Sequence, residues 1–291
     1  MVIVEIFNSL RPQQWIKNFF IFAPLIFSRS HLNPPLVLKT AAAFAAFCLI
    51  ASAQYIFNDI RDLEEDRLHP VKSKRPLASG SLKTGPAVLS CVLFTVLGLA
   101  VAAALNRGFL IISAAYLVLQ VLYSLRLKHV VILDVFVVAA GFVIRVVAGG
   151  LAIKVAISSW LLICTMLLAL FLALGKRRHE IGLLGGNATN HRPILEEYNT
   201  PFLDQMISVV TASTLIAYCL YTISEETVAK FGTRKLICTV PFVLYGIFRY
   251  LYLLHLKAEG GSPESLIIKD KPLLLDLFLW IVAVVLILGL R

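Results

Sequence analysis

Charged residues are scarce in this chain. Asp, Glu, Lys and Arg make up 15% of its 291 residues, hydrophobic residues make up 59%, and the mean hydropathy is +0.84. Soluble domains are about 45–50% apolar, so this composition excludes an ordinary soluble domain. Acidic residues are fewer than basic ones, 17 against 27, and the formal net charge is +10. No exposed basic surface interleaved with aromatic residues is evident, so we do not expect binding to nucleic acid.

Metal-binding cysteine and histidine patterns are also missing. The five cysteines lie inside apolar runs without a CxxC pair, and the six histidines show neither HxxxH nor HExxH spacing. The cysteines are therefore interpreted as small core residues, and we expect neither a zinc site nor a disulfide framework. Internal repeats are absent too, which argues against a transporter built from inverted halves.

Long apolar runs are what the sequence has in abundance. Runs of about 18–20 such residues are typical of membrane-spanning helices. The predicted fold class is all-α: a polytopic membrane protein with about nine transmembrane helices in one bundle, residues 1–291 forming a single domain. The first run is short and is expected to be tilted or partly re-entrant. The predicted spans are 16–30, 36–57, 86–105, 109–124, 131–150, 158–175, 205–223, 236–255 and 273–290.

The distribution of Lys and Arg predicts the orientation. Most of them fall in the N-terminal region and in loops 58–85, 125–130, 176–204 and 256–272. Because cytoplasmic loops carry the excess of positive charge, we expect these loops inside the cell. The prediction is a multi-pass protein of the inner or plasma membrane with an active site facing the cytoplasm.

An acidic stretch, residues 58–66, follows the apolar run that ends at Phe57. If the helix continues, Asn58, Asp62 and Asp66 are four residues apart and share one face, with Asp59 adjacent. Carboxylates stacked in this way repel one another, and a cation reverses that cost. Hard oxygen ligands suit Mg²⁺, which is usually completed by substrate phosphates. These four residues are the predicted metal ligands; the alternative is a solvated, acidic helix end.

A basic stretch, residues 69–80, comes directly after the acidic one. Lys74 and Arg75 within it are predicted to bind substrate. A metal held by carboxylates beside cations is the arrangement that a diphosphate requires.

Three further places in the sequence are candidate anion contacts. Lys17 and Arg11 either anchor the chain at the interface, or one of them meets a phosphate. Tyr123 and Lys128 have the same two interpretations. The sixth apolar run ends in a basic stretch, 176–178, which either complements the helix dipole or binds phosphate. Its predicted roles are catalytic for Lys176 and Arg177 and substrate-binding for Arg178 and Glu180, with Glu180 orienting an arginine.

Two ionisable residues lie inside the fifth run, Asp134 and Arg145. Such groups are costly in a membrane and usually face a partner or a wet cavity. They are about three turns apart, so they do not pair directly, and each is expected to have a partner elsewhere.

The acidic stretch resembles the UbiA superfamily of intramembrane prenyltransferases. Their NDxxDxxxD motif is matched by Asn58, Asp59, Asp62 and Asp66, and the continuation 74–80 is similar as well. The resemblance implies Mg²⁺ and a diphosphate in a cavity open to the cytoplasm and to lipid. Most members carry a second DxxxD motif after the sixth span, where this chain has residues 176–180, Lys-Arg-Arg-His-Glu.

The chain is most similar to one branch of that superfamily, the decaprenyl-phosphate phosphoribosyltransferases. The similar stretches are 11–18, 58–80, 175–180 and 202–206. The branch implies transfer of 5-phosphoribose from phosphoribosyl pyrophosphate to a polyprenyl (decaprenyl) phosphate, with release of diphosphate. Asp62 and Asp66 are then catalytic through the metal, and the two remaining phosphates require cations, which suits the basic replacement of the second motif.

Three other functions remain alternatives. An ordinary UbiA prenyltransferase acting on an aromatic or other small acceptor predicts an acidic second motif. A small-anion transporter predicts inverted repeats. A scaffold protein has no need of five acidic residues beside a basic cluster. The sequence makes no prediction of oligomeric state.

Overall fold

The computed structural model describes residues 2–28, 33–68, 70–184, 194, 197–257, 266, 267 and 269–289. Helices and their connections account for these residues, without a strand among them, which confirms the all-α fold class. The elements are α1 (Val2–Ser9), η1 (Pro12–Phe22), α2 (Ala23–Phe27), α3 (Pro34–Arg61), α4 (Leu63–Leu68), η3 (Lys72–Lys74), α5 (Thr84–Leu105), α6 (Arg107–Leu125), η4 (Leu127–His129), α7 (Leu133–Ile153), α8 (Ser159–Leu184), α9 (Thr200–Ile223), α10 (Glu225–Phe231), η7 (Lys235–Thr239), α11 (Val240–Leu256) and α13 (Lys271–Gly289).

Eight helices of the described chain are long and apolar enough to cross a membrane. They correspond to eight of the nine predicted spans. The remaining one, predicted at 16–30, is a 3₁₀ helix, η1, followed by the single short helix α2. Each of these two helices has a proline in its first turn, Pro12 and Pro24. Proline lacks an N–H and fixes φ, so it starts a helix readily and interrupts one that precedes it.

The chain divides into two compact units, with the boundary between Ala156 and Ile157. Helices α1 to α7 belong to the first unit, and α8 to α13 belong to the second.

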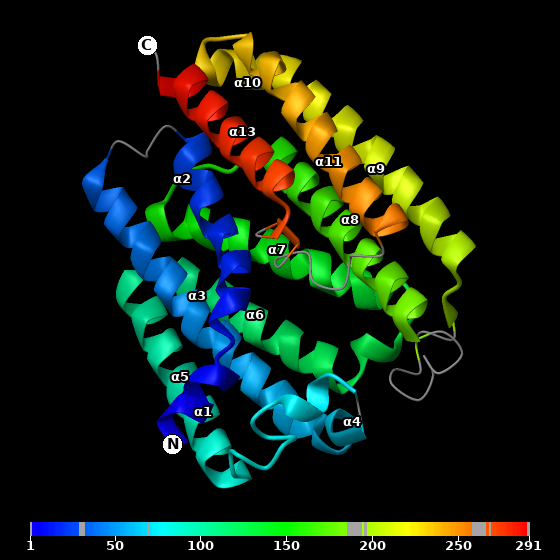
Figure 1. Cartoon of the computed structure of the whole chain (residues 1–291). Helices are drawn as coiled ribbons and strands as arrows, with labels where there is room; N and C mark the ends of the chain where they lie inside the picture. Colours follow the sequence, from blue (N-terminus) through cyan, green and yellow to red (C-terminus); the bar gives the residue numbers. More distant parts are fainter. Residues whose placement is uncertain are drawn as a thin grey trace. The chain divides into compact units, whose positions relative to one another are not determined.

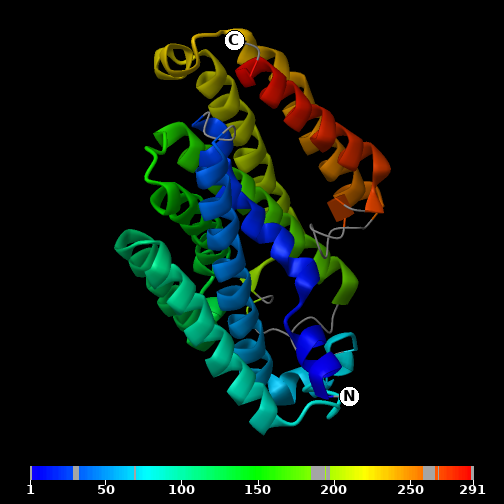
Figure 2. The same ribbon diagram turned by 90° about the vertical axis from the view of Figure 1, so that its left-hand side faces the viewer.

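The first unit is built around α3, which packs along α5 (Figures 1 and 2). Phe47 of α3 is fully buried and contacts two rings of α6: its centroid lies 5.8 Å from that of Phe109 and 5.3 Å from that of Tyr116. Offset and tilted aromatic pairs of this kind add to the energy of burial. This core fixes the direction of α3 and therefore the position of its last turn, residues 58–61.

The 3₁₀ segment η1 is held between α3 and α7 by polar contacts. Buried Arg145 of α7 donates hydrogen bonds to Asn18 Oδ1, the Gly141 carbonyl and the Tyr116 hydroxyl, each 2.8 Å long. The expectation that Arg145 has a partner elsewhere is confirmed. A Cβ at Gly149 would collide with the carbonyl group of Ile21, so η1 and α7 approach closely only because glycine stands there.

The second unit pairs α8 with α9, and α11 with α13 (Figure 2). Rings of Phe171 on α8 and Tyr250 on α11 lie 5.1 Å apart. Asn199 caps α9 by accepting a hydrogen bond from the Phe202 N–H at 2.8 Å, and capping of this kind fixes where a helix begins. Helix α8 continues to Leu184, so the predicted loop 176–204 begins with helix; parts of that loop and of 256–272 lie outside the described residues.

Candidate functional site

The acidic stretch keeps a helical register, as predicted. The Asp62 N–H donates to the Asn58 carbonyl at 2.9 Å, and the Asp66 N–H donates to the Asp62 carbonyl at 2.8 Å. Asn58, Asp62 and Asp66 therefore follow one another at successive turns across the junction of α3 and α4. Together with Asp59 they form what we call the acidic cluster.

Arg75 joins two members of the acidic cluster. Its Nη1 lies 3.1 Å from Asp59 Oδ1 and 2.5 Å from Asp66 Oδ2. Both carboxylate side chains are about 2% exposed. Charges so deeply buried are tolerated only when they are paired, and one guanidinium nitrogen here serves two carboxylates.

Three further cations reach the cluster: Arg11 and Lys128 from distant parts of the chain, and Lys72 from the segment that follows α4. Lys128 Nζ lies 2.7 Å from Asp62 Oδ1, and Lys72 Nζ lies 3.6 Å from Asp66 Oδ1. Arg11 forms an ion pair with Asp59. Carboxylates and cations thus alternate, which keeps like charges from facing one another.

Arg11 is held in an unusual backbone conformation. Its φ is +52°, in the left-handed region that non-glycine residues rarely adopt. Its guanidinium carbon lies 5.3 Å from the centre of the Tyr55 ring. Strained residues are retained where surrounding contacts over-determine them, often at functional sites. The turn before η1 directs this side chain to Asp59.

Two buried oxygens of the cluster lack hydrogen-bond donors among the described residues. They are Asn58 Oδ1 and Asp66 Oδ1, the second with only the 3.6 Å ion pair to Lys72. Unsatisfied buried oxygens are costly, and hard oxygens are the ligands that Mg²⁺ prefers. The donor set therefore fits a hard divalent cation. No group of three or more Asp, Glu, His or Cys side chains is poised for a metal in the described chain, because cations separate the carboxylates.

The other predicted residues of the first unit are Lys74, Lys17 and Tyr123. Lys74 is exposed in η3, and Arg75 rather than Lys74 reaches the carboxylates. Lys17 is half-buried in η1, and Tyr123 is half-buried in the last turns of α6. Their roles as substrate-binding residues stay predictions.

The basic stretch of the second unit lies on α8, and acidic side chains hold two of its arginines. Glu180 Oε2 accepts a hydrogen bond from Arg177 Nη1 at 2.7 Å, so this carboxylate orients an arginine one turn away. Arg178 Nε lies 2.5 Å from Asp204 Oδ1 of α9. Arg177 is 4% exposed, whereas Lys176 is half-buried.

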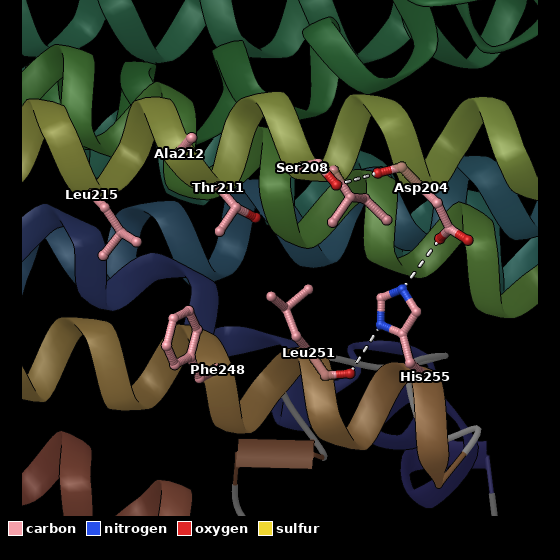
Figure 3. Close-up of a pocket in the computed structure, with 9 residues that line it drawn as sticks. Asp204, Ser208, Thr211, Ala212, Leu215, Phe248, Leu251 and His255 are labelled. Carbon is pink, nitrogen blue, oxygen red and sulfur yellow. Dashed lines mark hydrogen bonds and ion pairs between the residues drawn. The ribbon is translucent and has the colours of Figure 1, made fainter.

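His255 of α11 completes the contacts of Asp204. Its Nε2 lies 3.2 Å from Asp204 Oδ1, and its Nδ1 lies 3.0 Å from the Leu251 carbonyl. Both ring nitrogens therefore lie beside oxygen atoms (Figure 3).

A separate ion pair joins Arg249 and Asp270 in the second unit. Arg249 Nη2 lies 2.8 Å from Asp270 Oδ2, and Nε lies 3.1 Å from Oδ1. The hydrogen bond from Arg249 holds the pKa of Asp270 below its ordinary value.

Sequence reasoning assigned no role to two residues that the structure brings into these clusters, Asp204 and His255, and it counted Arg11 and Lys72 only among possible phosphate contacts. Lys72 lies in the basic stretch 69–80, Arg11 opens the stretch 11–18, and Asp204 directly precedes the apolar run 205–223. The partners of Arg11, Asp204 and His255 lie 26 to 51 residues away in sequence, so no local pattern shows those pairings, whereas Lys72 is six residues from Asp66.

The fold defines a multi-pass helical membrane protein with a buried cluster of acids and cations. Residues 19–282 match the UbiA prenyltransferase family. The chain belongs to this family.

Two curated relatives cover nearly the whole chain. The decaprenyl-phosphate phosphoribosyltransferase of Mycolicibacterium smegmatis is 32% identical over 94% of this chain and 89% of its own length. The protein of that name from Corynebacterium glutamicum is 32% identical over 96% of this chain and 85% of its own length.

Among solved structures, a UbiA homolog from Archaeoglobus fulgidus bound to GPP and Mg²⁺ is similar with a TM-score of 0.74. It is 19% identical, and the match covers 98% of this chain and 99% of that one. At this identity the likeness establishes the shared fold.

Proposed function

We propose that this protein transfers 5-phosphoribose from phosphoribosyl pyrophosphate to a polyprenyl phosphate such as decaprenyl phosphate, releasing diphosphate. The full-length similarity to two proteins named for that activity supports the choice of substrates. The bias of Lys and Arg toward one set of loops supports an active site that faces the cytoplasm.

The observation that carries the proposal is the alternation of acids and cations in the acidic cluster. Three carboxylates there face four described cations, contributed by Arg11, Lys72, Arg75 and Lys128. With a metal and a diphosphate bound, the carboxylates would hold the metal, and the cations that now pair with them would bind phosphate oxygens. A neutral or purely apolar substrate has no use for four cations at one place.

Mg²⁺ is the proposed cofactor, held by Asn58, Asp59, Asp62 and Asp66. When bound, it supplies charge neutralisation to the leaving diphosphate. The unsatisfied oxygens of Asn58 and Asp66 support this assignment.

The chain's own residues would contribute positioning and electrostatics. Arg75 and Lys72, both contacting Asp66, are placed to stabilise negative charge on the departing diphosphate. Lys128, paired with Asp62, and Arg11, paired with Asp59, add further positive charge near the same place. Lys74 is exposed in the same segment and is proposed to contact phosphoribosyl pyrophosphate as it enters the site.

The bond changes require no redox partner. An oxygen of the acceptor phosphate attacks C1 of the ribose, the C1–O bond to diphosphate breaks, and diphosphate leaves with the electron pair. A monophosphate with a second pKa of about 6 is mostly ionised at neutral pH, so no general base is required. Tyr123, Lys17 and the α8 residues Lys176, Arg177, Arg178 and Glu180 are proposed for the two remaining phosphates of the substrates.

The test is a transfer assay with purified protein in detergent, Mg²⁺, radiolabelled phosphoribosyl pyrophosphate and a polyprenyl phosphate. We expect label in the organic phase, lost with EDTA and with Asp62→Asn. Absence of label under conditions in which the protein is folded would refute the assigned reaction.

The second candidate is a prenyltransferase that moves a prenyl group from a prenyl diphosphate to an aromatic or other small acceptor. The shared fold with a homolog bound to GPP and Mg²⁺ favours it. Running the same preparation with a prenyl diphosphate and an aromatic acid decides between the two. Product in this second assay alone would replace the first proposal and leave the family membership intact.

A further inference from the structure

Ser52 of α3 has a buried hydroxyl that makes its hydrogen bonds outside its own helix. The residue is 1% exposed, accepts a hydrogen bond from the Trp15 indole N–H at 3.0 Å and donates one to the Leu10 carbonyl at 2.9 Å. Other buried hydroxyls of the first unit, those of Thr40 and Ser113, donate to a carbonyl four residues earlier in their own helix. Both hydrogen bonds of Ser52 are instead made to the N-terminal segment.

These two hydrogen bonds enclose Arg11 in the sequence. Leu10 directly precedes Arg11, and Trp15 lies four residues after it in η1. The φ of +52° at Arg11 is one that a non-glycine residue keeps only where surrounding contacts hold it. The Ser52 hydroxyl therefore joins both sides of this strained turn to one point on α3.

The side chain of Arg11 lies against the same face of α3. Ser52, Tyr55 and Asp59 follow one another at intervals of three and four residues, so they share that face. The guanidinium carbon of Arg11 lies 5.3 Å from the centre of the Tyr55 ring, and the guanidinium forms an ion pair with Asp59. One helix face thus fixes the backbone of Arg11, contacts its guanidinium and pairs with its charge.

Asp59 is not sufficient to orient Arg11 in a complex with substrate. Asp59 is a proposed metal ligand, and its Oδ1 already accepts a hydrogen bond from Arg75 at 3.1 Å as well as the ion pair from Arg11. With this carboxylate bound to a metal, the direction of the Arg11 guanidinium depends on the backbone turn and on Tyr55. A side chain that is already oriented loses less conformational entropy when it binds a phosphate.

We propose that Ser52 is a positioning residue for diphosphate binding: its hydroxyl fixes the turn at Leu10 so that Arg11 reaches a phosphate oxygen. The inference rests on the proposed function, specifically on its diphosphate site, and it assigns a role to a residue that acts through Arg11. It applies to phosphoribosyl pyrophosphate and to a prenyl diphosphate alike, because both carry this group.

The test measures the affinity of purified protein in detergent for inorganic pyrophosphate at saturating Mg²⁺, by isothermal titration calorimetry. Pyrophosphate is the leaving group of both candidate reactions, so the measurement does not depend on which transfer occurs. Arg11→Gln should weaken binding about tenfold to hundredfold, as for the loss of a hydrogen bond to a charged group. Ser52→Ala should weaken it about threefold to tenfold, because Arg11 is misdirected and not removed.

The double variant separates positioning from a general structural role. If Ser52 acts through Arg11, adding Ser52→Ala to Arg11→Gln should weaken binding by less than about twofold further, because the residue that it positions is gone. The same loss in both backgrounds would overturn the proposal. Unchanged affinity in Ser52→Ala, or no binding of pyrophosphate by the unmodified protein, would overturn it as well.

Ser113→Ala is the matched control, since Ser113 is 0% exposed in the same unit and its hydrogen bond stays within α6. Its affinity for pyrophosphate should equal that of the unmodified protein, and a loss as large as that of Ser52→Ala would contradict a specific role for Ser52. If Ser52→Ala does not fold, Trp15→Phe takes its place in the double variant. That change removes the indole N–H and should also weaken binding only when Arg11 is present.

The transfer assay keeps this inference distinct from the proposed reaction. Absence of transfer together with the expected pyrophosphate affinities would refute the reaction and leave the role of Ser52 intact. Transfer together with equal losses in both backgrounds would leave the reaction intact and refute the role of Ser52.

Discussion

The two units pair acids with cations in different ways. In the first, Asp59 and Asp66 are almost fully buried and are reached by cations 6 to 48 residues away in sequence. In the second, Glu180 and Asp204 are 24% and 36% exposed, and each holds an arginine of the same basic stretch. Asp59 and Asp66 share Arg75, and Asp66 keeps one oxygen without a hydrogen bond, which suits the proposed exchange of partners. Glu180 and Asp204 instead orient the arginines that are proposed to meet a substrate phosphate.

Removing one buried acid should give the largest effect. Asp66→Asn deprives Arg75 and Lys72 of their common carboxylate and removes a proposed metal ligand. We expect transfer activity to fall by roughly 10²–10³-fold, the cost of losing one preorganised electrostatic contact. Steady-state assays at saturating Mg²⁺ measure it.

Glu65→Gln is the control for that substitution, since Glu65 neighbours Asp66 and is exposed. Its activity should stay near that of the unmodified protein. Equal losses in both variants would mean that overall negative charge, not the buried pairing, is what matters.

Gly149→Ala should act on the first unit without altering any charge. The added methyl group collides with the Ile21 carbonyl, which forces η1 away from α7 and disturbs the turn that carries Arg11. We expect a loss of about 1–3 kcal/mol in stability, typical of overpacking, and reduced activity. Thermal unfolding in detergent measures the first quantity.

Gly182→Ala provides the comparison in the second unit, because a Cβ there meets no atom within 4 Å. It should leave the melting temperature unchanged or slightly higher, since alanine favours helix. A comparable destabilisation by the two alanines would contradict the close approach of η1 to α7.

Asp204→Asn should give a smaller and different effect. It frees Arg178 and His255 without removing a cation. We expect KM to rise about threefold to tenfold for the substrate whose phosphate Arg178 binds, with little change in kcat. This is the effect of losing one charged hydrogen bond. Asp270→Asn, which breaks the Arg249 ion pair instead, is the matched control and should leave KM unchanged. A fall in kcat as large as that of Asp66→Asn would erase the contrast between the units.

The smallest effect should be a pH dependence of stability from Asp270. Its pKa is lowered in the folded state by Arg249, so the pair stabilises the fold above the ordinary pKa of the carboxyl. That contribution is lost as the pH falls through the lowered folded pKa. Melting curves of the unmodified protein and Asp270→Asn should therefore differ by a few degrees near neutral pH and converge below about pH 4. Curves that diverge as the pH falls would contradict this sign.

Much of the fold follows from local sequence, and much of the site does not. Eight of the nine predicted spans are helices long and apolar enough to cross a membrane, and the spacing of Asn58, Asp62 and Asp66 predicts their common helical register. Both predictions succeed because they depend on neighbours along the chain. The choice of Arg75 over Lys74 depends on the turn after α4. The roles of Arg11 and His255 depend on how η1 and α11 dock, which is a tertiary property.

The short first segment was expected to be tilted or re-entrant, and the structure shows why it is a poor helix on its own. Prolines begin both of its pieces, and its stability comes from Trp15 donating to Ser52 at 3.0 Å and from Asn18 at Arg145. Hydropathy alone predicts a membrane span for such a segment, because it measures local composition and includes no tertiary contacts.

That dependence has a consequence for biogenesis. The bond between Arg145 and Asn18 joins residues 127 positions apart, so η1 leaves the ribosome long before the helix that secures it. At about 5–20 residues per second, the interval is roughly 6–25 s. During this interval η1 cannot pack on α7, which has not yet been synthesised. Arg11 likewise has no ion pair until Asp59 of α3 has been synthesised. The segment η1 is therefore held in place only after α7 has entered the membrane, well after η1 itself has been synthesised.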